Sequence, residues 1–307
     1  MTAAPPPARA ERPVRLPSLW LAALRAMAGR SGPIPALARR CEGLAARGRA
    51  RVAARLAAQG DPCLIRLEGV TLRVPLPLAL AFLDRRFDRL TIARLRRLVR
   101  PGMLAVDVGA HVGFYTLLLA RLVAPAGRVV AVEPAPENAS LLARNLEFAP
   151  ERSVEIVQAA AGREDRERTF VLSDSSDTHS FYPHPLSRSV GSVVVRERRL
   201  DRLLAASPDF VKIDVEGAEL EVLQGLSGLV CGDRPRAVLV EVNPACLEAA
   251  GASPAALLEW LEEHGFAPLE LADEQAGVVH RGGAACRAAL ARRERPGWFA
   301  NLLARRA

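Results

Sequence analysis

The feature that most limits the fold of this sequence is a repeated alternation of short apolar runs with segments of helical spacing. The runs MLAVDV (103–108) and RVVAVE (128–133) reach an acidic residue at or next to their end, whereas the apolar residues of 113–124 recur at helical spacing. Apolar strands that are buried on both faces and joined by helices form a mainly parallel, doubly wound sheet. We therefore predict an α/β fold with helices on both faces of the sheet.

The same patterns give the other elements of this core. The predicted strands are 103–108, 128–133, 153–160, 209–215, 236–242 and 266–272, with weaker strands at 167–173 and 191–198. The predicted helices are 113–124, 136–148, 200–205, 218–226 and 253–265. Ser-Pro before the last helix and Gly after it are typical start and stop signals.

The N-terminal third has a different pattern. Residues 1–60 are rich in Ala, Arg and Pro and form an arm that we expect to be partly helical or disordered. Residues 61–100 are expected to add a β-hairpin at 63–75, turning at Glu68 and Gly69, and one helix at 78–99. Residues 101–307 then form the ligand-binding domain.

Composition excludes several classes of protein. The formal charge is +8, but the arginines are scattered and few aromatic residues lie among them, so nucleic-acid binding is not expected. The five cysteines form no C-x-x-C pair, which argues against a disulfide framework or a zinc site and favours a reduced, cytoplasmic setting. No apolar run approaches the ~18 residues of a membrane span. The basic stretch 18–30 leaves contact with an anionic membrane surface as an alternative to a solvated arm.

Ligands of doubly wound sheets bind at the carboxyl ends of the strands, and the first such end reads VDVGAHVGFYT. A dinucleotide fingerprint needs G-x-G-x-x-G, but Asp107 and Val112 occupy two of its glycine positions. A nicotinamide or flavin dehydrogenase is therefore excluded. An acid at a strand end and a helix N-terminus instead suit the amine and carboxylate of an amino acid. The alternative is that Gly109 is only a turn residue.

The next two strand ends extend this interpretation. Glu133 closes the second strand, where an acid commonly accepts hydrogen bonds from the two hydroxyls of a ribose. Gln158, Ala159 and Ala160 close the third strand and leave room for a flat adenine. An amino acid and a ribose at adjacent strand ends describe S-adenosylmethionine better than a dinucleotide.

Four blocks, in this order, resemble the FkbM family of S-adenosylmethionine-dependent methyltransferases. They are VDVGAHVGFYT, VVAVEPAPEN, VKIDVEGAELEVLQG and LVEVNP, within residues 100–275. The resemblance implies a class I methyltransferase (Rossmann-like) sheet with a seventh, antiparallel strand, which we place after residue 276. It also implies cofactor contacts by the turn that contains Gly109, Ala110, His111 and Gly113. His111 departs from the family, which usually carries Asn there.

The block DFVKIDVEG contains Lys212, the only lysine of the sequence. Because strand side chains alternate, Lys212, Asp214 and Glu216 share one face at the strand end, beside the expected position of the cofactor sulfonium. Asp214 is the first candidate for the base that accepts the proton of an acceptor hydroxyl, or for the acid that holds the cofactor amine, with Lys212 orienting it. The alternative is a buried ion pair that only organises the strand end.

Other catalytic candidates lie nearby in the expected fold. Asp214, Glu241 and Asn243 close two neighbouring strands and could hold Mg²⁺ on oxygen ligands, although such carboxylates often contact only cofactor or substrate. The long polar loop 173–189 carries His179 and His184, either of which is a candidate base in a loop that closes over an acceptor. The alternative is an exposed loop with surface histidines.

These observations favour an O-methyltransferase that uses S-adenosyl-L-methionine and acts on a hydroxyl of a sugar, a glycoside or a polyketide-type natural product. A protein or a lipid-linked glycan as acceptor is the alternative within the same class. A methyltransferase fold that has lost its chemistry and serves as a binding protein is the alternative outside it. The sequence carries no signal for the acceptor or for the oligomeric state.

Overall fold

The computed structural model describes residues 13–15, 48, 50–84, 88–149, 153–230, 233–292 and 297–306. The chain divides into two compact units, Met1–Phe87 and Asp88–Ala307. None of the helices within these described ranges is both long and apolar enough to cross a membrane.

The first unit contains the predicted hairpin. β2 (Cys63–Leu67) and β3 (Val70–Val74) pair antiparallel, and the short β1 (Val14–Arg15) pairs parallel to β2. Both turn residues have positive φ, 50° at Glu68 and 86° at Gly69, which matches the twist that a two-residue hairpin turn requires. Ile65 and Leu72 are fully buried on one face, so the alternating pattern that predicted the hairpin also gives it a core.

The second unit is built on a central sheet of eight strands in the order β13-β12-β14-β11-β10-β4-β5-β6. Its parallel part comprises β4 (Leu104–Val108), β5 (Arg128–Val132), β6 (Val154–Val157), β10 (Phe210–Ile213) and β11 (Ala237–Val242). The remaining strands are β12 (Phe266–Asp273), β13 (Val278–Arg281) and β14 (Ala300–Arg306). β14 lies antiparallel between β11 and β12, which confirms the antiparallel strand expected after residue 276.

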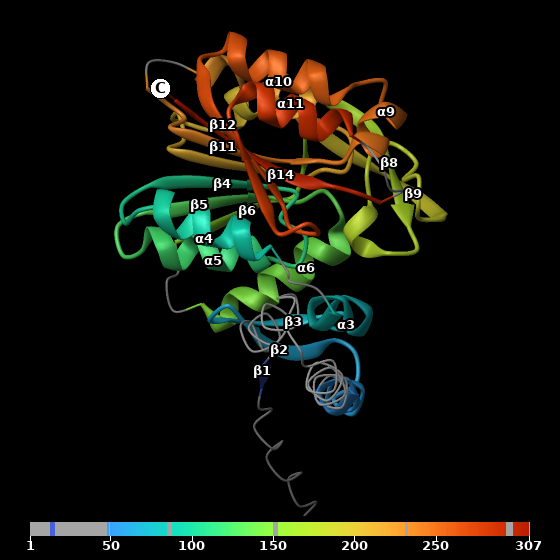
Figure 1. Cartoon of the computed structure of the whole chain (residues 1–307). Coiled ribbons are helices and arrows are strands. Elements are labelled where there is room, and N and C mark those ends of the chain that lie inside the picture. Colours follow the sequence, from blue (N-terminus) through green and yellow to red (C-terminus); the bar gives the residue numbers. More distant parts are fainter. Residues whose placement is uncertain are drawn as a thin grey trace, which may run out of the picture. The chain divides into compact units, whose positions relative to one another are not determined.

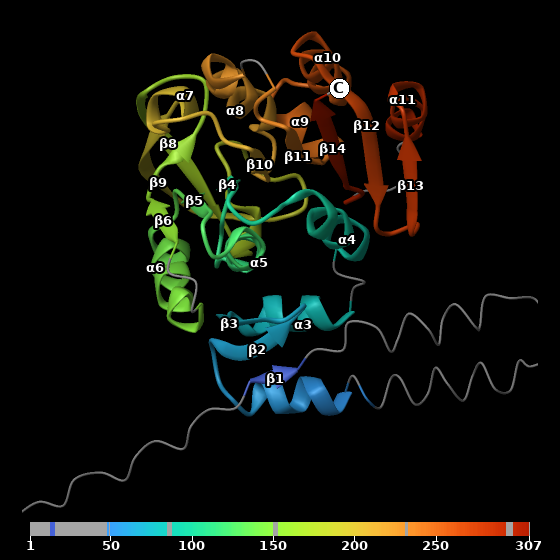
Figure 2. The same cartoon turned by 90° about the vertical axis from the view of Figure 1, so that its left-hand side faces the viewer.

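Helices cover both faces of this sheet (Figures 1 and 2). α4 (Arg89–Leu98), α5 (Phe114–Val123) and α6 (Pro136–Asn145) lie on one face. α8 (Glu219–Leu226), α10 (Pro254–Glu263) and α11 (Gly283–Ala291) lie on the other. The central strands are buried on both faces, as the continuous apolar runs predicted. The α/β, doubly wound fold is therefore confirmed.

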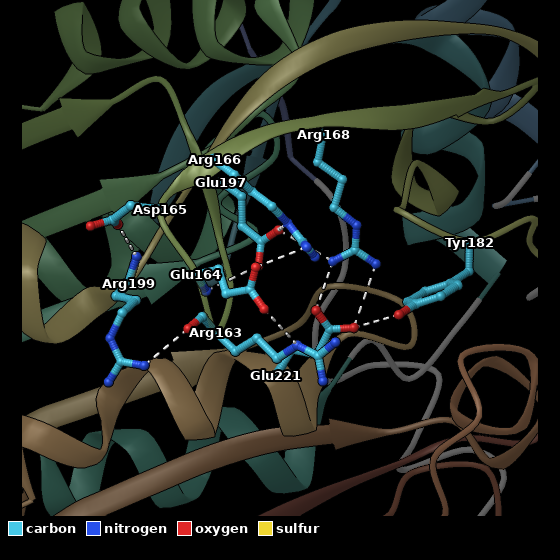
Figure 3. Close-up of polar contacts among 9 residues, drawn as sticks. All are labelled: Arg163, Glu164, Asp165, Arg166, Arg168, Tyr182, Glu197, Arg199 and Glu221. Atoms are coloured by element: carbon cyan, nitrogen blue, oxygen red, sulfur yellow. Dashed lines mark hydrogen bonds and ion pairs between the residues drawn. The ribbon is translucent and has the colours of Figure 1, made fainter.

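A second sheet lies beside the carboxyl end of β6. It has the order β7-β9-β8, formed by β7 (Ala160–Ala161), β8 (Arg166–Ser173) and β9 (Ser189–Arg198). The two long strands correspond to the weaker strands expected from sequence. β9 packs against the rest of the unit through Val195 and the fully buried Glu197, which is paired with Arg166 at 2.9 Å. Figure 3 shows these charges and those of α8 joined in one network.

Two expectations are corrected by the structure, which also adds a helix to the expected elements. The helix expected over 78–99 is two helices, α3 (Leu76–Asp84) and α4, with Asp88 in a left-handed conformation before α4. The strand expected over 153–160 ends at Val157, where a turn leads the chain to pair with β9. The helix α9 (Pro244–Ala249) was not predicted, although its cap signal is in the sequence: Asn243 accepts a hydrogen bond from Cys246 N, and Pro244 follows it.

Candidate cofactor and active site

The turn after β4 packs directly against the end of β10. Gly109 has φ of 74°, and a Cβ atom placed there would lie 1.7 Å from the carbonyl oxygen of Asp214. Gly113, with φ of 95°, begins α5 and leaves no room for a Cβ beside Leu142. Only glycine allows both the conformation and the close approach. The turn therefore brings the N-terminus of α5 next to the strand end that carries Asp214.

Glu133 lies at the end of β5 and is 4% exposed. Its carboxylate accepts hydrogen bonds from the backbone N–H of His111 at 2.8 Å and of Ala135 at 2.9 Å. Burial raises the pKa of Glu133 to about 7, although these N–H donors oppose the shift. The contact with His111 fixes the carboxylate beside the Gly109 turn, in the position that the sequence predicted for a ribose contact.

Lys212 lies opposite Asp107 in the β10–β4 register. Its Nζ is 2.9 Å from Asp214 Oδ2 and 3.7 Å from Asp107 Oδ1. The Lys212 side chain is 4% exposed and that of Asp107 is fully buried, whereas the Asp214 side chain is 32% exposed. Asp214 is thus the member of this group that solvent or a ligand reaches.

The charge state of the pair follows from its geometry. Burial opposes the charge of Lys212, but Asp214 and Asp107 raise its pKa above the ordinary value. Burial also opposes ionisation of Asp214, but Lys212 holds the pKa of that carboxyl below its usual range. Lys212 is therefore an ammonium and Asp214 a carboxylate at neutral pH.

A second set of groups contacts Lys212 from the side of α5. Its Nζ lies 4.6 Å from the ring centroid of Tyr115, whose hydroxyl donates a 2.6 Å hydrogen bond to Asp88. Asn301 on β14 donates to the other oxygen of Asp88 at 3.3 Å. Burial raises the pKa of Asp88 to about 6. Sequence reasoning missed Asp88, because it precedes a helix far from any strand end.

A pocket lies along these strand ends. Of the predicted site residues, its lining includes Gly109, His111, Glu133, Ala160, His179, Asp214 and Glu216. Asp107, Ala110, Gly113, Ala159 and Lys212 are not part of the lining. Gln158 is exposed and also lies outside the lining, because the chain turns immediately after β6. The structure thus brings Glu133, the candidate for the ribose contact, together with the Gly109 turn and Asp214 around one pocket.

The pocket has an aromatic wall that the sequence did not reveal. Phe170 on β8 and Phe181 in the β8–β9 loop (residues 174–188) meet edge to face, with ring centroids 5.6 Å apart. Arg168 lies 3.8 Å over the Phe181 ring and donates a 2.7 Å hydrogen bond to Glu221 of α8. Tyr182 donates to the same Glu221, as Figure 3 shows. The network of Figure 3 therefore holds this wall against α8.

Two histidines at the pocket are hydrogen-bonded in ways that limit their chemistry. His179 Nδ1 accepts a 3.0 Å hydrogen bond from Ser173 N, so the neutral ring carries its proton on Nε2. Burial lowers the pKa of His179. Its Nε2–H is therefore suited to donate to a ligand rather than to accept a proton. His111 contacts Ser176 Oγ at 2.9 Å, and burial lowers its pKa to about 4.

The predicted magnesium ligands come together only in part. Carboxylate oxygens of Asp214, Glu216 and Glu241 lie within 4.8 Å of one another. Asn243 instead caps α9 through Cys246 N. Burial, followed by the charge of Asp214, raises the pKa values of Glu216 and Glu241 well above the ordinary range. The candidate cluster is thus three carboxyls in which Asp214 carries the charge.

Comparison with known proteins decides between the families compatible with this geometry. The sequence model of the methyltransferase FkbM domain matches residues 107–268, which is more than half of the chain. The chain belongs to the FkbM methyltransferase family. This confirms the resemblance carried by the four sequence blocks, and the match includes the Gly109 turn, Glu133 and the Lys212–Asp214 pair.

Curated relatives of the chain include methyltransferases. Methyltransferase 1 of Beauveria bassiana is 31% identical over 39% of this chain and 57% of its own length. Hexuronic acid methyltransferase AglP of Haloferax volcanii is 27% identical over 51% of this chain and 60% of its own length. The match thus spans less than two thirds of either relative. Among solved structures, TYW2 of P. horikoshii in complex with MeSAdo has a TM-score of 0.46 at 13% identity, over 80% of this chain and 72% of that one.

Proposed function

We propose that the protein is an S-adenosylmethionine-dependent O-methyltransferase that acts on a hydroxyl of a sugar, a glycoside or a polyketide-type natural product. The observation that carries this proposal is the arrangement of Glu133 and Asp214 around the Gly109 turn in one pocket. Family membership supports the reaction class. The name of the Haloferax volcanii relative, a hexuronic acid methyltransferase, supports a sugar acceptor.

The residues present fit the cofactor. The buried Glu133 carboxylate suits the ribose hydroxyls, and the small side chain of Ala160 leaves space beside it. The N-terminus of α5 behind the Gly109 turn suits a carboxylate, and Asp214 suits the amine or sulfonium. The bound cofactor supplies a methyl group on a positively charged sulfur. We assign its adenosine to the Glu133 side of the pocket and its amino-acid end to the Asp214 side.

The chain then has two tasks toward the acceptor. The hydroxyl must lose its proton as the methyl group is transferred, and Asp214 is the ionised and accessible group on the strand-end face. A positioned general base typically contributes about 10²–10⁴ and works best with a pKa near the working pH, so the lowered pKa of Asp214 favours the lower end of this range. Lys212 holds Asp214 in place, and His179 Nε2–H provides a donor for a second oxygen of the acceptor. The aromatic wall suits the apolar face of a sugar ring.

Two measurements test this proposal. Titration calorimetry should show binding of S-adenosylmethionine and of its demethylated product, and no binding of NAD. A methyl-transfer screen over sugars, glycosides, lipid-linked glycans and proteins, read by mass spectrometry, should find an acceptor that gains one methyl group. Binding without transfer to any acceptor would favour a binding protein with a methyltransferase fold. Failure to bind the cofactor would contradict both the proposed methyltransferase activity and the alternative of a cofactor-binding protein without activity.

A further inference from the structure

Three potential metal ligands from separate segments converge beside the pocket. His184 comes from the β8–β9 loop, Glu216 from the turn after β10, and Cys246 from α9. Glu216 Oε2 is 3.7 Å from His184 Nε2 and 3.3 Å from Cys246 Sγ. One ligand atom from each of the three residues lies within 4.8 Å of the other two. The His184 and Glu216 side chains are 6% and 15% exposed, and Cys246 is 1% exposed.

The distances fit the edges of a small coordination polyhedron. Zinc bonds of about 2.0–2.3 Å in a tetrahedron place N, O and S donors about 3.4–3.6 Å apart. The two separations from Glu216 Oε2, 3.7 and 3.3 Å, lie close to these edges. A set of imidazole, thiolate and carboxylate favours Zn²⁺ over Mg²⁺, which prefers oxygen ligands. We infer that His184, Glu216 and Cys246 form a binding site for a zinc-class divalent ion.

The backbone already directs two of the three ligands toward each other. Glu216 has φ of 55°, a left-handed conformation that is uncommon for a residue with a long side chain. The following Gly217 has φ of 115°, and a Cβ atom there would lie 2.7 Å from the carbonyl oxygen of Cys246. The 216–217 turn is therefore packed on the backbone of α9. Strain of this kind persists where the surrounding structure fixes it, often at functional positions.

Metal binding by His184 requires a change in the hydrogen bonding of its ring. His184 Nδ1 accepts a 3.2 Å hydrogen bond from Leu186 N, which leaves the proton of the neutral ring on Nε2. When Nε2 binds a metal, Nδ1 must carry the proton, so the Leu186 N–H has to turn away from the ring. This hydrogen bond is exposed, and both groups can bond to water instead. Ion binding is thus coupled to a local rearrangement at residues 184–186.

The position of the site gives the ion a structural consequence. The ion would connect the β8–β9 loop to α9 and to the end of β10 through one set of bonds. Because Glu216 also lines the pocket, the ion would lie at the pocket wall. Three protein ligands leave a fourth position for water or for an oxygen of the acceptor. Metal binding itself does not depend on the methyl-transfer reaction proposed above, so the metal site and the proposed function can be tested independently.

Cobalt substitution tests the site directly. The full chain, freed of metal with a chelator, is titrated with Co²⁺, and a thiolate-to-cobalt charge-transfer band in the near ultraviolet reports a cysteine ligand. We expect one Co²⁺ per chain, displaced by Zn²⁺ and not by Mg²⁺. Cys246→Ser should abolish the band, and His184→Gln should weaken binding by at least about tenfold. Cys286→Ser and His280→Gln, which change a cysteine and a histidine outside the cluster, should leave both unchanged.

The outcomes separate this site from its alternatives. Circular dichroism shows whether the Cys246→Ser variant folds. If it does not fold, the His184→Gln variant still tests the site, because this change lies in a loop. Co²⁺ binding without a thiolate band, lost in Asp214→Asn, would place the ion on the three carboxyls and overturn the inference. The absence of specific Co²⁺ or Zn²⁺ binding would also overturn it, and would leave Glu216 as a hydrogen-bond partner of Cys246. Because the readout is metal binding, a failed methyl-transfer screen would not affect either conclusion.

Discussion

The ammonium of Lys212 on β10 lies 2.9 Å from the carboxylate of Asp214, the residue that directly follows this strand. Residues at i and i+2 of a strand point to the same face, so the pair is a local consequence of the sequence KID. The amine is also 3.7 Å from the buried Asp107 on the neighbouring strand. A compact ammonium can contact carboxylates on two strands, whereas the planar guanidinium of arginine requires a larger opening. This accounts for one lysine in a chain that otherwise uses arginine.

The Lys212–Asp214 pair gives the first prediction. Asp214→Asn should keep the fold and lower methyl transfer by about 10² or more, because the positioned carboxylate is lost. Lys212→Met should lower both transfer and Tm. It leaves Asp107 buried without its counter-ion, and breaking a buried pair in this way typically costs about 3–5 kcal/mol. The measurements are the rate per folded molecule and the Tm of each variant.

The double variant Lys212→Met/Asp214→Asn separates a catalytic pair from a structural one. A double variant that transfers methyl groups at the wild-type rate would contradict the assignment of Asp214 and move the search for the base to the neighbouring carboxyls. A double variant that is inactive but more stable than Lys212→Met alone would support it.

The turn at Gly109 gives the second prediction. Gly109→Ala should unfold the strand end or abolish cofactor binding, because the new methyl group would overlap the Asp214 carbonyl at 1.7 Å. Two control variants separate the conformational cost of the substitution from the cost of steric overlap. Gly102→Ala keeps a φ of 87° but meets no atom within 4 Å, and should cost about 1 kcal/mol for conformation alone. Gly191→Ala meets no atom and has ordinary φ, and should be neutral or nearly so. Chemical denaturation gives the free energy of unfolding of the three variants. Equal losses of stability in Gly109→Ala and Gly102→Ala would contradict the packing argument.

The fold was predicted well because burial on both faces leaves a continuous apolar run in each central strand. The rule that ligands bind at the carboxyl ends of such strands singled out Glu133 and Asp214, and both line the pocket. The strand end beyond Val157 differs from the expectation because it depends on contacts distant in sequence. Gln158 was assigned to the adenine because the strand pattern runs on to Ala160, and only the pairing of Ala160 with Glu197 shows that the strand has ended. The loop that contains Phe181 was expected near an acceptor, but its polar pattern did not show that Phe181 would pack against Phe170 of β8.

The aromatic wall gives the third prediction. Arg168→Gln removes the ion pair with Glu221 and the cation over Phe181, both partly shielded from solvent. We expect a loss of about 1–3 kcal/mol in the free energy of unfolding, since charged hydrogen bonds are lost. The KM for the acceptor should rise more than that for the cofactor. Arg202→Gln is the matched control, because its side chain is 65% exposed and its salt bridge should contribute less than about 1 kcal/mol. An Arg168 variant as stable as the control would show that the network of Figure 3 does not support the wall.

The buried carboxyl of Glu133 gives the last prediction, a pH dependence of cofactor binding. Burial raises its pKa to about 7, so the carboxylate that we propose as the acceptor of hydrogen bonds from the ribose hydroxyls forms only as the pH rises through neutrality. Affinity for S-adenosylmethionine should therefore fall below pH 7, by up to about tenfold per pH unit, and binding at pH 7 should release protons.

The stability of the free protein should change in the opposite direction. A carboxyl whose pKa is raised in the folded state binds its proton more tightly there, so the contribution of Glu133 to stability is complete below about pH 4.5 and is lost as the pH rises through 7. Glu133→Gln should remove both dependences and weaken binding at pH 8 by about 1–3 kcal/mol. Calorimetry in buffers of different ionisation enthalpy gives the affinity and the proton count, and thermal melts give the stability. Because other buried carboxyls also titrate, the comparison is between the wild type and the variant at each pH. Equal pH profiles of affinity in the two proteins would show that Glu133 is not the ribose contact.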